Sequence, residues 1–129
     1  MAERYLIDTS AAIKYLNGTF PLKGLQFMDH VVDVESILSF ISEIELQVWN
    51  PEDPDDINIY KQFVSNSIIL FLENGIIPET IRVRKTYNLK LPDALIAATC
   101  LINNMTLIAD NDKDFARVES LVCINPNNL

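Results

Sequence analysis

With 129 residues, the chain is the size of one domain and is long enough to bury a core without disulfide or metal staples. Its formal net charge of −8 argues against nucleic acid as a partner unless something neutralises the acid, and its single histidine, His30, argues against a zinc site of nitrogen and sulfur ligands. The longest apolar run, residues 68–72, is far too short to span a bilayer, so no membrane partner is expected.

Apolar runs and helix-period patterns alternate along the chain. In order they predict a strand at 4–8, a helix at 10–17, a loop and helix within 19–33, a strand at 36–42, helices at 43–49 and 57–64, a strand at 67–72, helices at 78–88 and 92–103, a strand at 105–110, a short helix at 113–118 and a strand at 121–125. The acidic stretch NPEDPDD predicts a solvated turn and not a domain boundary, because neither half could hold a core alone.

We therefore expect one α/β domain over residues 1–129, with a central, mostly parallel five-stranded sheet flanked by helices. In such sheets, ligands bind in the crevice outside the carboxyl ends of the strands. The first residues do not combine a basic start with a long apolar stretch, so we expect a cytoplasmic protein. Its two cysteines, Cys100 and Cys123, are expected to stay reduced.

Acidic residues follow the predicted strands and open the most apolar helix. Asp8 ends the first strand, Glu43 follows the second, and Asp93 begins the helix of LPDALIAATC. The stretch ADNDKDF follows the fourth strand and contributes Asp110, Asn111, Asp112 and Asp114.

Taken singly, each of these residues has a structural interpretation, and that interpretation is favoured. Asp8 could be the N-cap of the first helix, and Asp93, next to a proline, suits the first turn of its own helix. Ser42 and Glu45 have the spacing of a capping box, which assigns Glu45 to structure. Asn111 could cap the short helix that follows it.

Taken together, the acids favour a metal site. Glu43 is not needed for the capping box and lies next to Ile41 and Ile44, which are expected in the core. Asp93 enters a helix that is apolar all round, where an unpaired carboxylate is costly. Neither lysine nor arginine adjoins Asp8, Glu43 or Asp93 in the sequence. Because crowded carboxylates repel, a divalent cation bound by oxygen ligands is the usual remedy.

Five stretches, YLIDTS, SEIEL, RKTYNLKLPDALIAAT, TLIADNDKDF and CINP, give nearly the whole chain a resemblance to PIN domains, and most closely to the small VapC-like toxins of bacterial toxin–antitoxin pairs. The resemblance implies that the catalytic and metal-binding acids are Asp8, Glu43, Asp93 and Asp114, with further candidates in Asn111, Asp112, Asp110 and Thr9. Ala109 stands where threonine is usual in the family, which removes a hydroxyl from the site. It remains open whether Asp110 or Asp112 shares the role of Asp114.

The resemblance further implies a Mg²⁺- or Mn²⁺-dependent endoribonuclease that hydrolyses RNA as the toxin of a pair, with a small antitoxin protein and a second copy of the chain as partners. One alternative is a PIN fold without catalysis that serves as a binding module. A phosphoacceptor receiver module is another, but it needs an aspartate after the middle strand and a lysine after the last. Glu73 and Pro126 follow those strands here.

Two other features have both a functional and a structural interpretation. The basic residues Arg82, Arg84, Lys85 and Lys90 could form a track for an RNA backbone, but a solvated helix face is favoured. Trp49 and the segment 20–28 could form an exposed partner surface, but a place in the core is favoured.

Overall fold

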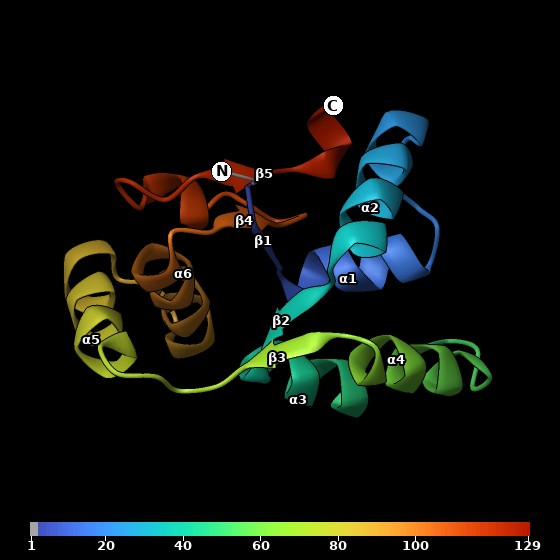
Figure 1. Ribbon diagram of the computed structural model, residues 1–129, viewed down its shortest axis with the longest axis horizontal. Helices are drawn as coiled ribbons and strands as arrows, with labels where there is room; N and C mark the ends of the chain where they lie inside the picture. Colours follow the sequence, from blue (N-terminus) through green and yellow to red (C-terminus); the bar gives the residue numbers. More distant parts are fainter. Residues whose placement is uncertain (1–2) are drawn as a thin grey trace.

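The computed structural model describes residues 3–129 (Figure 1). Strands and helices alternate as the sequence predicts. In chain order the elements are β1 (Tyr5–Ile7), α1 (Thr9–Leu16), α2 (Leu22–Val34), β2 (Ile37–Ser39), α3 (Phe40–Val48), α4 (Asp56–Ser65), β3 (Ile68–Leu70), α5 (Ile76–Tyr87), α6 (Leu91–Asn103), β4 (Thr106–Ile108), the 3₁₀ turn η1 (Phe115–Arg117), β5 (Cys123–Ile124) and the 3₁₀ turn η2 (Pro126–Asn128).

All the strand pairs are parallel, which confirms the predicted class of fold. β1 pairs with β4 and β4 with β5, while β2 pairs with β3. Five strands were predicted in one sheet, but within residues 3–129 they form a three-stranded sheet, β1-β4-β5, and a two-stranded sheet, β2-β3. The strands are so short, two or three residues each, that β1 and β2 lie in contact without a ladder between them.

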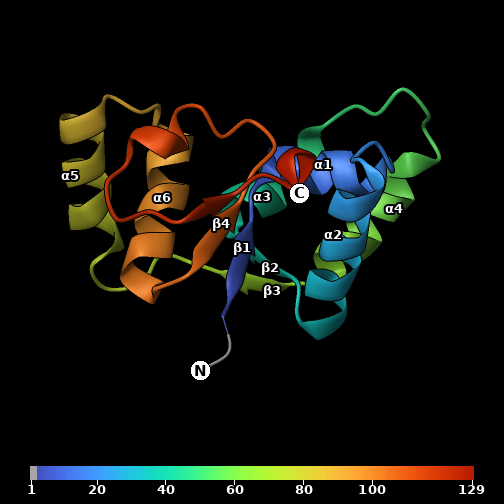
Figure 2. The same cartoon turned by 90° about the horizontal axis from the view of Figure 1, so that it is seen from above.

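Alternate residues of the strands point into two separate cores. Leu6, Ile37 and Leu107 pack with side chains of α5 and α6, and we call this the α6-side core. Their neighbours in sequence, including Ile7 and Ile108, pack with side chains of α1, α2, α3 and α4, which form the α1-side core. This is the period of two that a strand imposes on its side chains. The views in Figures 1 and 2 show α5 and α6 on one side of the strands and α1, α2 and α4 on the other.

Helix α6 begins and ends where its sequence signals indicate. Pro92 lies in its first turn, where a missing backbone N–H costs nothing, and Asn104 follows its last residue in the left-handed conformation with a φ of 57°. Its alanines Ala94, Ala97 and Ala98 are fully buried. The small side chains let α6 pack closely on the sheet and place Asp93 at the sheet's carboxyl edge.

Helix α3 begins three residues earlier than predicted. Ser39 ends β2 and caps α3, because its Oγ accepts a hydrogen bond from the backbone N–H of Ile41 at 3.1 Å. Ser42, which was expected at the end of a strand, is therefore buried within the helix. The capping-box interpretation of Ser42 and Glu45 is wrong, because both residues lie inside the helix.

Burial agrees with the sequence predictions at some side chains and differs from them at others. Phe20 and Met28 are buried as predicted, whereas Trp49 and Ile44, both expected in the core, are 46% and 54% exposed. The basic residues of α5 and the α5–α6 turn are exposed, as expected for a solvated face. Both cysteines are free, with Cys100 buried and Cys123 half-buried. No helix within residues 3–129 is long and apolar enough to cross a membrane.

The C-terminal turn η2 packs directly on α2. Gly24 of α2 is buried, and a Cβ placed on it would lie 2.3 Å from the backbone oxygen of Pro126. Only glycine permits this approach, because a Cβ would force the two backbones apart. The contact holds the last residues of the chain beside the carboxyl end of β4.

Candidate active site

Asp8 is a buried carboxylate at the junction of β1 and α1. It is 7% exposed, and although it occupies the N-cap position of α1, its side chain makes no capping bond to a described residue. Instead, Oδ2 of Asp8 accepts a hydrogen bond from Ser10 Oγ at 2.7 Å. The pKa of Asp8 is raised to about 6, mainly by burial and to a smaller extent by the negative charge of Asp93, against the lowering effect of the Ser10 hydroxyl.

Asp93 lies in the first turn of α6 and is half-buried. Burial is the main cause of its raised pKa, followed by the negative charges of Asp114 and Glu45, while Lys90 acts in the opposite direction. Asp93 is thus surrounded by acids from other parts of the chain. A favourable interaction with the dipole of α6 would explain Asp93 alone, but it does not explain why other acids lie near it.

Glu45, which the sequence assigned to structure, points toward these acids. Its Oε1 accepts a hydrogen bond of 2.6 Å from Thr9 Oγ1, and Thr9 Oγ1 also lies 2.9 Å from Ser42 Oγ. Glu43 is two residues earlier on the same helix, which turns its side chain by about 200° relative to Glu45. Glu43 is not among the described residues that line the cavity formed by these acids.

The spacing of apolar residues could have identified Glu45. Ser42, Glu45 and Leu46 are separated by three and four residues, so they share one face of α3, and both Ser42 and Leu46 are buried. A helix predicted at 43–49 divides residues 41–46 between a strand and a helix, and this shared face is then not visible in the sequence pattern.

The acids that follow β4 have different environments. Asp114 is close enough to Asp93 for its negative charge to raise the Asp93 pKa. Its Oδ1 is also 3.2 Å from Nη2 of Arg117, in an ion pair whose two side chains are about half exposed. Asp112 is half-buried and does not line the cavity that Asp93, Asn111 and Asp114 share. The expected cap position of Asn111 is occupied by Asp114, which makes no side-chain capping bond within the described chain.

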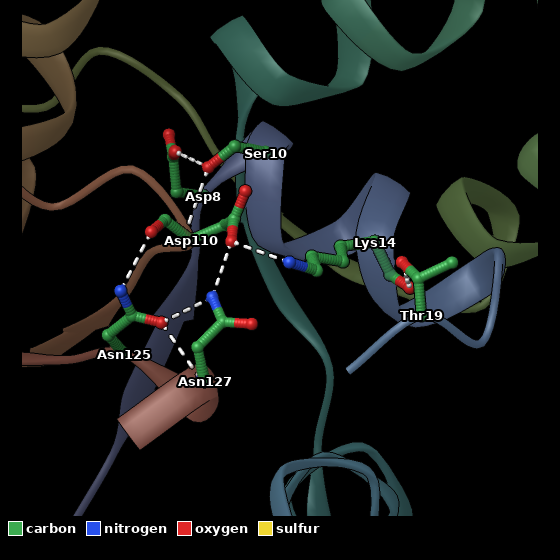
Figure 3. Close-up of polar contacts among 7 residues, drawn as sticks. All are labelled: Asp8, Ser10, Lys14, Thr19, Asp110, Asn125 and Asn127. Atoms are coloured by element: carbon green, nitrogen blue, oxygen red, sulfur yellow. Dashed lines mark hydrogen bonds and ion pairs between the residues drawn. The ribbon is translucent and has the colours of Figure 1, made fainter. Parts of the chain in front are cut away.

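Asp110 is paired elsewhere (Figure 3). Its Oδ1 is 3.3 Å from Lys14 Nζ and accepts a hydrogen bond of 2.5 Å from Asn127 Nδ2. Asn125 Nδ2 donates to the backbone oxygen of Asp110 at 2.8 Å, and the backbone N–H of Asp110 donates to Ser10 Oγ at 3.3 Å. Asp110 therefore has a cationic partner and an amide donor of its own, and its backbone N–H bonds the same Ser10 hydroxyl that bonds Asp8.

A cavity of about 670 Å³ unites these groups at the carboxyl ends of the strands. It is lined by Asp8, Thr9, Ser10, Ile13, Glu45, Val48, Trp49, Asn50, Asp93, Asn111, Asp114 and Phe115, and we call it the carboxylate cavity. None of its described lining residues is lysine or arginine. Ala109 does not line it but packs in the α6-side core, so the side chain that departs from the family pattern faces away from the acids.

The donor set of the carboxylate cavity suits a hard divalent cation. Within residues 3–129, no three or more His, Cys, Asp and Glu residues are arranged to hold one ion directly. Mg²⁺, however, usually keeps several waters and is bound through one or two carboxylates. Asp8 and Asp93, whose pKa values are raised mainly by burial and by neighbouring acids, are two carboxylates that fit that mode of binding.

The family model of the PIN domain matches residues 5–121, and the chain belongs to this family. It is similar in fold to DNA-bound VapBC from Salmonella typhimurium, with a TM-score of 0.81 and 14% identity over 97% of this chain and 99% of that one. It is also similar to a toxin–antitoxin complex from Klebsiella pneumoniae, with a TM-score of 0.72 and 24% identity over 95% and 97%. For VapBC2 from Rickettsia felis bound to a promoter DNA fragment, the TM-score is 0.77 and the identity 21% over 94% and 97%. None of the curated proteins compared with the chain matches it.

Proposed function

We propose that this PIN domain is a Mg²⁺- or Mn²⁺-dependent endoribonuclease that hydrolyses RNA phosphodiester bonds as the toxin of a toxin–antitoxin pair. One observation carries the proposal: four carboxylates, from Asp8, Glu45, Asp93 and Asp114, surround one cavity that has no basic residue in its described lining. Such a cavity repels phosphate unless cations enter it. A bound divalent ion would supply stabilisation of charge on the phosphate oxygens and a more acidic water.

The side chains of the cavity divide into metal ligands and groups that orient them. Asp8 and Asp93 are the proposed ligands, and Ser10 fixes the rotation of the Asp8 carboxylate by its hydrogen bond. We assign to Glu45 the catalytic and metal-binding role that the family resemblance implies for Glu43, because Glu45 lines the cavity and Thr9 holds it there. Asp114 is the proposed fourth acid, with Asn111 beside it.

The proposed partners are RNA, a small antitoxin protein and a second copy of the chain. Support for an antitoxin comes from the similar structures, which are described as VapBC and toxin–antitoxin complexes. Half-exposed Trp49 and exposed Val48 on the rim of the cavity give such a partner apolar surface to cover. The mass in solution, compared with the chain mass of 14.6 kDa, tests for the second copy.

The absence of a preformed group of three metal ligands within residues 3–129 favours one alternative, a PIN fold that binds partners without catalysis. Incubation of the purified protein with labelled single-stranded RNA separates the two. We expect cleavage with Mg²⁺ or Mn²⁺, none with EDTA, and none for Asp8→Asn or Asp93→Asn that retain the wild-type circular dichroism spectrum. Failure of every RNA to be cleaved under all cation conditions would favour the binding module.

A further inference from the structure

Besides its acids, the lining of the carboxylate cavity includes four uncharged, mostly apolar side chains, which we call the uncharged wall: Ile13, Val48, Trp49 and Phe115. Trp49 is the largest side chain of this wall and is 46% exposed. It follows α3 directly, and its backbone N–H donates to the backbone oxygen of Glu45 at 3.1 Å. Trp49 therefore lies one helical turn beyond Glu45, on the same face of the helix.

The Trp49 side chain is approached from more than one direction. Besides the carboxylate cavity, it lines a small hollow of about 70 Å³ with Leu46 and Tyr60. It also lines a hollow of about 490 Å³ with Leu16 and Pro51. Because Trp49 is 46% exposed and borders three hollows, it is not packed into the core, and part of its surface is accessible to a ligand.

Charge limits what kind of contact can bind a nucleotide here. The described lining of the carboxylate cavity offers no lysine or arginine to a phosphate, and the whole chain carries a net charge of −8. Within this lining, apart from a bound cation, attraction comes from groups without charge. Stacking of a base on an aromatic side chain is such a contact, and it corresponds to roughly a 5- to 150-fold change in affinity per base.

We propose that Trp49 is the stacking platform for a nucleobase next to the phosphate that is cleaved in single-stranded RNA. The proposal rests on the proposed ribonuclease function and names the part of the substrate that the uncharged wall binds. The cavity volume of about 670 Å³ lies in the range of sites for small molecules and accommodates a nucleotide. The competing occupant of this wall is a peptide segment of a partner protein.

The first test uses fluorescence, because Trp49 is the only tryptophan of the chain. The wild-type protein with Mg²⁺ is titrated with adenosine 5′-monophosphate and, in parallel, with ribose 5-phosphate. Neither compound contains a phosphodiester to cleave, and they differ by the base. We expect saturable quenching by the nucleotide and little change with the sugar phosphate. Equal responses to the two compounds would overturn the proposal.

The second test uses the kinetics of RNA cleavage. Trp49→Ala is expected to raise KM at least fivefold with kcat nearly unchanged, and Trp49→Phe, which retains an aromatic ring, should recover most of the loss. Ile44→Ala is the matched control, because Ile44 is 54% exposed on the same helix but does not line the cavity. An unchanged KM for Trp49→Ala, together with weaker binding of a partner protein, would assign the wall to that partner and refute the proposal.

The two tests keep the proposals apart. If the wild-type protein cleaves RNA but Trp49→Ala has no effect on KM, the stacking platform fails and the ribonuclease stands. Base-dependent quenching by adenosine 5′-monophosphate without any RNA cleavage would instead refute the ribonuclease, and with it the place of the base next to a cleaved phosphate, and would leave Trp49 as a contact for nucleotide binding only.

Discussion

The Thr9 hydroxyl and the two glutamates of α3 give a direct test of the site. Thr9 holds Glu45 at 2.6 Å, whereas Glu43 is turned away by about 200° around the helix. We expect Glu45→Gln to lower kcat/KM for RNA cleavage by about 10- to 100-fold, the range found when groups around a bound metal are changed. Glu43→Gln, the same substitution two residues away, should stay within about twofold of wild type. Initial rates at saturating Mg²⁺ provide the measurement, and the opposite ranking would restore the assignment to Glu43.

Asp8 makes the stability of the metal-free protein depend on pH. Because burial raises its pKa in the folded state from 3.8 to about 6, folding favours the protonated carboxyl. The favourable effect is complete below the unfolded pKa and is lost as the pH rises through about 6. Between about pH 5 and pH 8, Asp8 should therefore lower the free energy of unfolding by roughly 1–2 kcal/mol.

Urea unfolding in EDTA at these two pH values measures this effect, and Asp8→Asn is the reference because it cannot ionise. The difference in unfolding free energy between wild type and Asp8→Asn should shift against the wild type at the higher pH. A constant difference would contradict a buried, uncompensated Asp8.

At the scale of elements, the sequence predicted the ends of α6 well because its signals are local. Pro92 at the start and Asn104 at the end act within a single turn. The start of α3 was not predictable in the same way. Residues 36–42 form a continuous apolar run with serines, and such a run fits a strand as well as a helix. The decision between them depends on the parallel pairing of Ile37–Ser39 with β3, which is a contact across 31 positions of the chain.

The position of Asp110 was unpredictable for a related reason. It carries the same charge as Asp114 and lies only four residues before it, yet it bonds Lys14 and Asn127, which come from opposite ends of the sequence. Spacing alone gives no sign of such partners. Three acids after β4 were therefore equivalent in the sequence, although their surroundings differ in the structure.

The turn η2 is expected to stabilise the site through Asp110. Removing the Asn127 amide by Asn127→Ala leaves the partly buried Asp110 with one partner fewer, which should cost roughly 1–3 kcal/mol for a hydrogen bond to a charged group. Asn128→Ala is the matched control, since Asn128 is exposed in the same turn. Chemical denaturation of the two variants measures the cost. Equal stabilities would show that the turn does not support Asp110.

At the scale of the whole molecule, the acidic cavity predicts stabilisation by divalent cations. An ion that binds only the folded state adds RT ln(1 + [L]/Kd), or about 2.7 kcal/mol at a hundredfold excess over Kd. Mn²⁺ should stabilise at least as well as Mg²⁺, in line with the order of affinities along the transition series. Melting curves at constant ionic strength, with and without each cation, measure the gain.

Variants locate the bound cation in the same experiment. Asp93→Asn should lose most of the gain from Mn²⁺, whereas Glu119→Gln, which removes an exposed acid outside the cavity, should keep it. An equal gain in all three proteins would place the cation elsewhere. No gain in any of them would support the binding module without metal.

The α1-side core and the α6-side core meet at the carboxylate cavity. Asp8 and Glu45 belong to elements that pack in the α1-side core, whereas Asp93 and the segment of Asp114 are anchored in the α6-side core. Repulsion between the acids therefore pushes the two cores apart at the cavity, where only very short strands lie between them. A cation bound between the acids replaces this repulsion with attraction to the carboxylates of both cores. We expect the bound cation to slow the separation of the two cores without changing the packing within either core.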